Sequence, residues 1–329
     1  QNSVARDHSA KMEADEDMCM EAEGEEDPTE SARWARDNSD VVWCQTAEGL
    51  LQAVADGNLK VEVGAIPEGE AEQLLQAVQQ VAPHIKALSL TGCHLDDAAI
   101  VRLGNVLAAS QIEEIGVSNN VDVSAAAWGE FWAKLPQTVV KWDHGDNNFP
   151  DEVLPKLVVA MGKGRVQELF LDGNELADIS PLLAVVAESP NLTELDIGDN
   201  NVGDEHVTAL AHLLPGSNLS TLVLGRNPLT DASAQVLAYA LPRSKITILH
   251  LDSTQITDRT LWILSEVLPD TVLEELHVDQ TKVKDEGVLR FCQALPGSTV
   301  RLLDASDNGL SETTIAAIEA ALPTDVSME

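Results

Sequence analysis

Residues 169–176 read Leu-Phe-Leu-Asp-Gly-Asn-Glu-Leu, and residues 195–202 repeat the pattern as Leu-Asp-Ile-Gly-Asp-Asn-Asn-Val. In both octets apolar residues occupy the first, third and eighth positions, and asparagine occupies the sixth. Apolar residues two positions apart are typical of a β-strand that buries one of its faces. Each octet therefore predicts a short strand followed by a turn.

The first residue of the octet recurs along most of the chain, and we take it as the centre of a predicted strand. All spacings between centres are 27 residues except one of 26, and the centres are Val61, Leu88, Ile115, Trp142, Leu169, Leu195, Leu222, Leu249, Leu276 and Leu303. Eight of the 14 prolines share a second phase, namely Pro83, Pro136, Pro190, Pro215, Pro242, Pro269, Pro296 and Pro323. Proline at that phase ends a helix because it cannot continue one. A fixed period over ten units predicts a repeat solenoid.

Two polar phases complete the repeat. Five residues after the centre stand Cys93, Asn120, Asn147, Asn174, Asn200, Asn227, Thr254, Thr281 and Asn308, which we expect to form a polar ladder inside the coil. Nine residues after the centre stand Asp97, Ser124, Asp151, Asp178, Asp204, Asp231, Asp258, Asp285 and Glu312. A carboxylate or hydroxyl just before an apolar helical segment is typical of an N-cap. We therefore expect these nine residues to cap the helices, which gives them a structural role.

The unit of strand, turn, capped helix and proline closely resembles leucine-rich repeat proteins of the ribonuclease-inhibitor subclass. The two octets quoted above match the LxLxxNxL core of that family. The resemblance implies an α/β solenoid of about ten repeats over residues 59–323, with a parallel sheet on the concave face and α-helices on the convex face. Proteins of this class, such as ribonuclease inhibitor and the Ran GTPase-activating protein, hold other proteins.

The segments outside the repeats differ in composition. Residues 1–40 hold 13 acidic and 4 basic residues, a net charge of −9, and we expect this acidic leader to be disordered. Residues 41–58 are predicted to form an N-terminal cap that Trp34 and Trp43 help to close, and residues 324–329 a C-terminal tail. Four scattered cysteines favour a soluble intracellular protein. The first residue, Gln1, leaves a removed targeting peptide open.

Composition excludes several functions. The chain has 55 acidic and 20 basic residues, a formal charge of −35, which argues against binding to nucleic acid or to an anionic membrane. Nucleotide-binding loops, nucleophile elbows and zinc-protease helices are missing from the sequence. We therefore predict a protein that is not an enzyme and needs no cofactor.

The open face of the predicted sheet is strongly acidic. Residues that flank a strand centre point away from the core, and from the second repeat onward 27 such positions hold ten acids and one base, Lys141. Like charges on neighbouring strands cost stability, which a basic partner would relieve. We expect a protein with a basic surface to contact Glu168, Phe170, Asp172, Glu194, Asp196, His250, Asp252, Glu275, His277, Asp279 and Asp304. Apolar residues on the same face, Phe170, Val223, Ile248 and Leu302, are the expected anchors.

Two details of the repeats have alternative interpretations. His250, Asp252, His277, Asp279 and Asp304 could together hold Zn²⁺, but no supporting second shell is evident, so we favour a polar contact face and predict no metal. In the fourth repeat, Trp142 and His144 replace the expected leucines, and we expect a wider core with a hydrogen-bonded histidine.

The preferred function is a protein-interaction scaffold or a subunit of a larger complex. The alternative is a GTPase-activating protein, because the fold and acidity resemble those of the Ran activator. In that activator, however, the acidic block follows the repeats, whereas here it precedes them.

Overall fold

A computed structural model of the chain describes residues 40–64, 66–67, 69–162 and 165–322. The predictions for the acidic leader up to residue 39, for Trp34 and for the tail 324–329 lie outside the described residues. From Asp40 onward the chain forms one compact unit.

The strands of this unit form one parallel sheet in which every strand pairs with its neighbours in the sequence, in the order β1 to β11. The strands are β1 Val42–Cys44, β2 Lys60–Gly64, β3 Ala87–Thr91, β4 Glu114–Gly116, β5 Lys141–Asp143, β6 Glu168–Phe170, β7 Glu194–Asp196, β8 Thr221–Val223, β9 Ile248–His250, β10 Glu275–His277 and β11 Leu302–Asp304. Equivalent residues of successive repeats lie side by side, as Leu249, Leu276 and Leu303 do. The ten predicted strand centres all lie on these strands.

One α-helix follows each strand of the described chain. The helices are α2 Ala47–Ala55, α3 Ala71–Val81, α4 Asp97–Leu107, α5 Ala125–Trp132, α6 Leu154–Met161, α7 Ser180–Glu188, α8 Asp204–Leu213, α9 Asp231–Ala240, α10 Asp258–Val267, α11 Asp285–Ala294 and α12 Glu312–Ala321. A short 3₁₀ turn, η1 Asp151–Val153, precedes α6. Helices α8, α9 and α10 each end in a 3₁₀ turn that contains one of the phased prolines. These turns are η2 Leu214–Gly216, η3 Leu241–Arg243 and η4 Leu268–Asp270.

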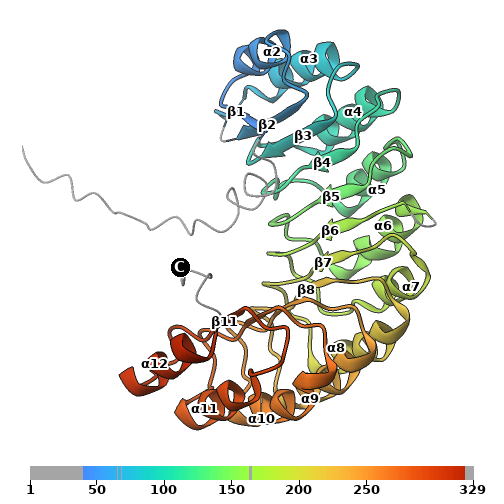
Figure 1. Cartoon of the computed structure of the whole chain (residues 1–329). Coiled ribbons are helices and arrows are strands. Elements are labelled where there is room, and N and C mark those ends of the chain that lie inside the picture. Colours follow the sequence, from blue (N-terminus) through green and yellow to red (C-terminus); the bar gives the residue numbers. More distant parts are fainter. Residues whose placement is uncertain (1–39, 65, 68, 163–164, 323–329) are drawn as a thin grey trace, which may run out of the picture. The chain divides into compact units, whose positions relative to one another are not determined.

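The sheet lies on the concave side of the unit and the helices on the convex side (Figure 1). Between them the strand centres and the residues two positions later are buried, for example Leu222 and Leu224. The prediction of a leucine-rich repeat solenoid is confirmed. In the described part of the chain, no helix has the length and apolar character needed to cross a membrane.

The polar ladder inside the coil is also confirmed. The side chain of Asn174 accepts hydrogen bonds from the backbone amides of Asn147 and Phe149, at 3.0 and 2.9 Å. It donates to the carbonyls of His144, Leu171 and Asp172. One side chain thus connects the turns of two successive repeats, which satisfies buried backbone groups that would otherwise be costly.

The predicted helix caps require a correction. Ser124 is an N-cap, but Asp97, Asp204, Asp231, Asp258, Asp285 and Glu312 are the first residues of their helices. The caps with side-chain hydrogen bonds in α4, α9, α10 and α12 are the preceding residues Asp96, Thr230, Thr257 and Ser311.

The aspartates instead link neighbouring repeats. Asp231 accepts hydrogen bonds from the amide and hydroxyl of Thr257, at 2.9 and 2.7 Å, and from the hydroxyl of Thr260 at 2.6 Å. Asp204 binds Thr230 and Ser233 in the same way. Each of these carboxylates therefore holds the N-terminus of the next helix, because parallel packing of the helices brings that terminus within its reach.

The predicted cap, residues 41–58, contains a strand and a helix of its own. In β1, Val42 and Cys44 pair in register with Val61 and Val63 of β2, and Thr46 caps α2. The first unit is thus built like the repeats that follow. Trp43 is 54% exposed on β1.

The irregular fourth repeat has an aromatic core. His144 is fully buried among Trp128, Phe131, Trp132 and Phe149. The indole Nε1 of Trp132 donates to His144 Nε2 at 3.2 Å, which agrees with the expected wider core and hydrogen-bonded histidine. Burial lowers the pKa of His144 to about 3, because the imidazolium would be poorly solvated.

Candidate partner-binding face

The sheet surface turned away from the helices, here called the open face, carries every predicted contact residue. These residues lie on the strands β6, β7, β9, β10 and β11 or two positions after a strand ends. Their order along the sheet is Glu168, Phe170, Asp172, Glu194, Asp196, His250, Asp252, Glu275, His277, Asp279 and Asp304. Because the strands pair in exact register of equivalent residues, the repeat pattern alone brings these side chains into rows.

Exposure separates these residues into two groups. Phe170 and Asp196 are buried, with 6% and 1% of their surface exposed, whereas the other nine are partly exposed. Lys141 Nζ lies 5.0 Å from the centre of the Phe170 ring. Val223, another expected anchor, is also 6% exposed. Phe170 and Val223 therefore offer little apolar contact area to a partner, whereas the partly exposed Ile248 and Leu302 offer more.

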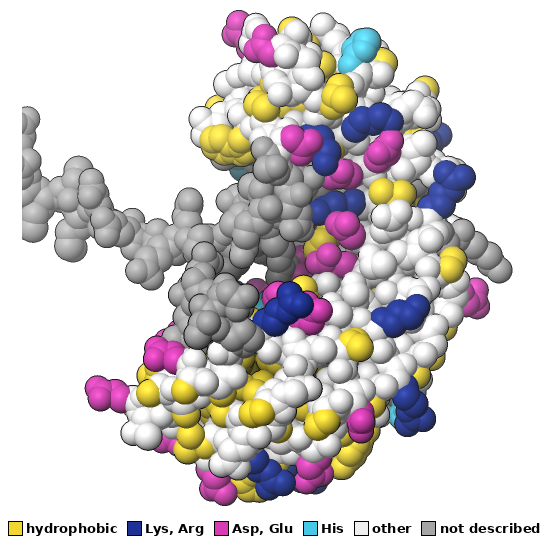
Figure 2. Space-filling view, viewed as in Figure 1, with side chains coloured by type: hydrophobic (Ala, Val, Ile, Leu, Met, Phe, Trp, Pro, Cys, Tyr) yellow, Lys and Arg dark blue, Asp and Glu magenta, His cyan; other side chains and the backbone are white. Residues whose placement is uncertain are grey.

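In the amino-terminal half of the open face, on β2 to β6, acids lie beside bases. Lys60 forms an ion pair with Glu114 at 3.2 Å, and Lys141 forms one with Glu168 at 3.0 Å. Figure 2 shows dark blue and magenta side chains close together over this half of the unit. Lys60 lies in the first repeat, outside the 27 open-face positions from the second repeat onward.

Glu62 in this half was not singled out from the sequence either. It is buried, and its pKa is raised to about 7 by burial and by the nearby charge of Asp143. Its position beside a strand centre could have identified it.

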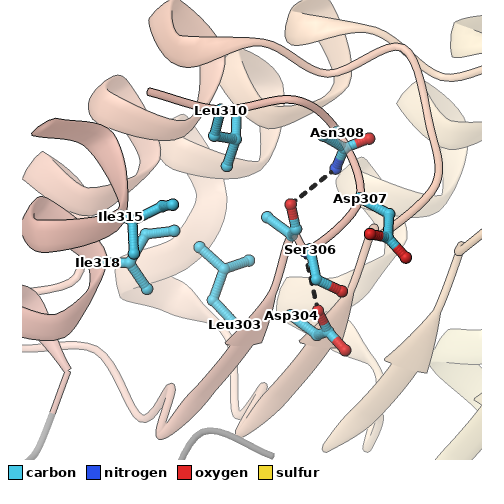
Figure 3. A pocket seen from close by; sticks show the side chains of 9 residues that line it. Leu303, Asp304, Ser306, Asp307, Asn308, Leu310, Ile315 and Ile318 are labelled. Atoms are coloured by element: carbon cyan, nitrogen blue, oxygen red, sulfur yellow. Dashed lines mark hydrogen bonds between the residues drawn. The ribbon is translucent and has the colours of Figure 1, made fainter. Parts of the chain in front are cut away.

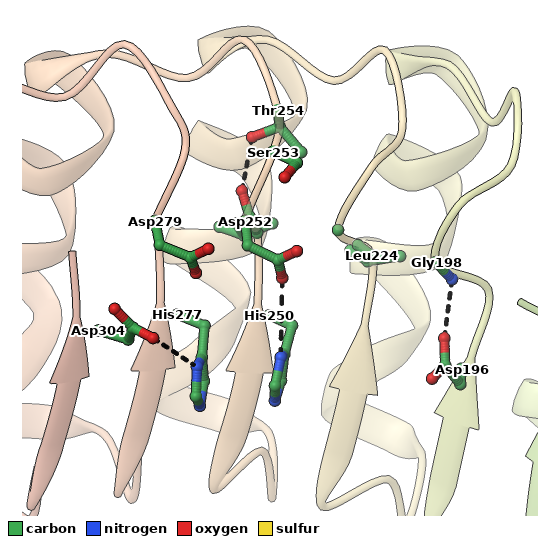
Figure 4. Close-up of polar contacts among 12 residues, drawn as sticks. Asp196, Gly198, Leu224, His250, Asp252, Ser253, Thr254, His277, Asp279 and Asp304 are labelled. Atoms are coloured by element: carbon green, nitrogen blue, oxygen red, sulfur yellow. Dashed lines mark hydrogen bonds and ion pairs between the residues drawn. The ribbon is translucent and has the colours of Figure 1, made fainter. Parts of the chain in front are cut away.

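At the carboxy-terminal end of the open face, on β9 to β11, the carboxylates meet imidazoles instead. The rings of His250 and His277 stack with centroids 3.9 Å apart and planes inclined by 9° (Figure 4). His250 Nδ1 lies 3.7 Å from Asp252 Oδ1, and His277 Nδ1 lies 3.8 Å from Asp304 Oδ2. Within the described residues, open-face carboxylates of these three strands form ion pairs with the two histidines.

The carboxylates of this end repel one another. Burial, together with the charges of Asp252 and Asp304, raises the pKa of Asp279 to about 6. The contact with His277, and a hydrogen bond from the Ser306 amide, lower the pKa of Asp304 to about 2 although burial opposes them. Three carboxylates therefore share a region of negative potential that favours a bound cation.

A glycine just after the neighbouring strand β8 makes room for this arrangement. A Cβ atom at Gly225 would collide with the carboxylate of Asp252. The carboxylate of Asp252 therefore lies directly over the backbone that follows β8.

A separate pocket of about 190 Å³ opens at the end of the last repeat (Figure 3). Leu303, Leu310, Ile315 and Ile318 form its apolar wall, and Ser306 and Asn308 lie on its polar side. Ile315 is 40% exposed. The pocket lies beside β11, which pairs with β10 alone among the described strands.

The comparisons with known proteins concern the fold. A family model described as "Leucine Rich repeat" matches residues 188–211, about one repeat. No curated protein sequence matches the chain. Together with the strand and helix pattern, the match defines this chain as a leucine-rich repeat solenoid.

The solved structures that resemble this one include a yeast protein complex, an internalin and an actin-binding site of leiomodin-1. The structure of the Rad7 and Elc1 complex in yeast matches with a TM-score of 0.57 and 15% identity, covering 84% of this chain and 79% of that chain. An internalin from Listeria monocytogenes matches with a TM-score of 0.46 and 16% identity, covering 82% and 79%. The leiomodin-1 actin-binding site 2 matches with a TM-score of 0.41 and 18% identity, covering 45% and 89%. At these identities the likeness to the Rad7 structure shows the fold alone.

Proposed function

We propose that this chain is a non-enzymatic protein-interaction scaffold that binds a basic protein through the open face between β6 and β11. The observation that carries the proposal is the contrast in counter-charges along the sheet. In the amino-terminal half, lysines form ion pairs with the acids. On β9 to β11, within the described residues, acids form ion pairs with two histidines.

Electrostatics supports a basic partner at this end. Lysine and arginine side chains brought near Asp252, Asp279 and Asp304 would relieve the repulsion that, together with burial as the larger cause, raises the pKa of Asp279. A field of one sign on a concave surface also speeds the encounter with an oppositely charged protein. Ile248 and Leu302, which are partly exposed beside the acids, supply apolar contact area.

The repeat architecture supports the scaffold role as well. A solenoid offers an extended concave surface suited to protein partners. The Rad7 structure with the similar fold is itself a protein complex. The 27-residue strand–helix repeat favours the ribonuclease-inhibitor-like subclass, to which we assign the chain as part of this proposal.

The alternative of a GTPase-activating protein receives less support. Arginine supplied in trans is a common means of accelerating GTP hydrolysis, yet the open-face positions from β7 to β11 hold no arginine in the sequence. A GTP-hydrolysis assay with small GTPases tests the alternative, which requires faster hydrolysis when the chain is added.

The scaffold proposal is tested by capture from native extract with three forms of the full chain. The first form is the wild type, and the second carries Asp252→Asn, Glu275→Gln and Asp279→Asn on the open face. The third carries Glu188→Gln, Glu205→Gln and Glu319→Gln on exposed helix positions, which removes the same charge. We expect a basic protein to be retained by the wild type and the helix variant, lost from the open-face variant, and released at high salt. Equal retention by both variants would refute the proposed site.

A further inference from the structure

The contact residues on β10 and β11 have a second chemical property, because they include three groups that can ligate one metal ion. Ligand atoms of His277, Asp279 and Asp304 all lie within 4.8 Å of one another. Figure 4 shows the Asp304 carboxylate and the His277 ring facing each other from neighbouring strands, with Asp279 two residues beyond the ring. In the described part of the chain this is the one group of its kind.

We propose that His277, Asp279 and Asp304 form a binding site for a divalent transition-metal ion, for which Zn²⁺ is the best-fitting candidate. The proposal does not rest on the scaffold function, and it revises the expectation from the sequence that the five polar residues form only a contact face.

The distances fit shared coordination better than direct hydrogen bonding. His277 Nδ1 and Asp304 Oδ2 are 3.8 Å apart, beyond the range of a hydrogen bond. Two ligands of one tetrahedral zinc ion, each at about 2.1 Å from it, lie about 3.4 Å apart. A small side-chain rotation would bring the three ligand atoms to that separation, since all of them are partly exposed and lie on adjacent strands.

The structure also supplies the supporting contacts that the sequence could not reveal. The His277 ring is held flat against the His250 ring at 3.9 Å. The backbone amide of Ser306 donates to Asp304 Oδ1 at 2.9 Å, which leaves Oδ2 directed toward His277. Contacts of this kind fix the orientation of ligands and raise metal affinity.

The ligand set indicates the kind of ion. One imidazole and two carboxylates suit zinc and its neighbours in the first transition row, whereas calcium and magnesium favour oxygen ligands alone. The ion's two positive charges would offset the repulsion among the carboxylates, to which Asp252, just after β9, also contributes. Three protein ligands leave one tetrahedral position for water or for a side chain of a bound protein.

The test is a calorimetric titration of Zn²⁺ into the full chain, purified without a histidine tag and freed of metal with a chelator. We expect one zinc ion to bind at micromolar affinity or better, and Asp304→Asn and Asp279→Asn each to weaken it at least tenfold. Glu275→Gln is the matched control, because it removes one carboxylate from the open face of β10 without removing a ligand. It should change the affinity less than threefold.

Thermal unfolding provides a second measurement that is independent of the heat signal. Zinc that binds only the folded chain raises its Tm, and this rise should disappear in Asp279→Asn, a change that also removes a crowded charge and therefore preserves the fold. The proposal is overturned if the wild type binds no zinc. It is equally overturned if the ligand variants bind zinc as the wild type does, which would place the ion elsewhere, for example at the acidic leader.

Discussion

The two ends of the solenoid use the same backbone for different purposes. In the amino-terminal half, Asn174 bridges two turns inside the coil and His144 is buried among indoles. At the carboxy-terminal end the ladder position holds Thr254, Thr281 and Asn308, and two further polar groups, His250 and His277, lie on the open face. The repeat pattern therefore determines where each strand lies. The residues at its variable positions either stabilise the core or form the surface that is open to a partner.

The largest expected effect concerns the ladder. Asn174→Ala removes five hydrogen bonds and leaves the buried amides of Asn147 and Phe149 without an acceptor. We expect a loss of about 3–5 kcal/mol in the free energy of unfolding, measured by denaturant titration. Thr254→Ala, at the same phase, removes one bond to the Leu251 carbonyl and should cost about 1 kcal/mol. Similar losses at the two positions would remove the contrast in how the two ends are stabilised.

The second prediction concerns the buried histidine, His144. Because the folded-state pKa of His144, about 3, lies below its unfolded value, the unfolded chain binds the proton first as the pH falls. The stabilisation is complete above pH 6.5 and decreases between pH 6.5 and 3, by about 3 kcal/mol on reaching pH 4. Unfolding followed by tryptophan fluorescence should show this pH dependence in the wild type and a weaker one in His144→Gln. Identical pH profiles for the two proteins would contradict the assignment.

A smaller effect distinguishes the inter-repeat carboxylates from helix caps. Asp231→Ala removes three hydrogen bonds to the next repeat and should cost about 2 kcal/mol. Asp258→Ala removes the bond from the Lys284 amide and should cost about 1 kcal/mol. If each aspartate acted mainly as the cap of its own helix, the two substitutions would be equivalent, and equal losses in chemical denaturation would favour that role.

How far the sequence predicts the structure depends on whether the position of a residue in the repeat allows one role or several. Strand centres such as Leu195 and ladder residues such as Asn174 follow from the period, because each occupies a fixed place in one unit. The role of Asp231 does not follow from the period, because Asp231 lies one residue after the N-cap Thr230. A carboxylate there could cap its own helix or bind the next unit, and its hydrogen bonds go to Thr257 and Thr260 of the next unit.

The site shows the same division. Periodicity places His250 and His277 in one row, and pairing in register confirms it. Their stacking, the orientation of Asp304 by the Ser306 amide and the burial of Phe170 depend on side-chain rotamers and on neighbouring strands. A pattern of residue types carries no information about those rotamers.

The most direct test of the central claim measures how fast a lysine-rich peptide associates with the full chain, at low and at physiological ionic strength. The open-face variant with Asp252→Asn, Glu275→Gln and Asp279→Asn is compared by stopped-flow with the helix variant that loses the same charge. Because screening shortens electrostatic interactions to about 8 Å at physiological salt, the wild-type rate should fall as salt rises. We expect the open-face variant to associate about tenfold more slowly than the wild type at low salt, while the helix variant stays within twofold. Equal rates for the two variants would contradict this expectation, because the acids of β9 to β11 would then act only through the net charge of the chain.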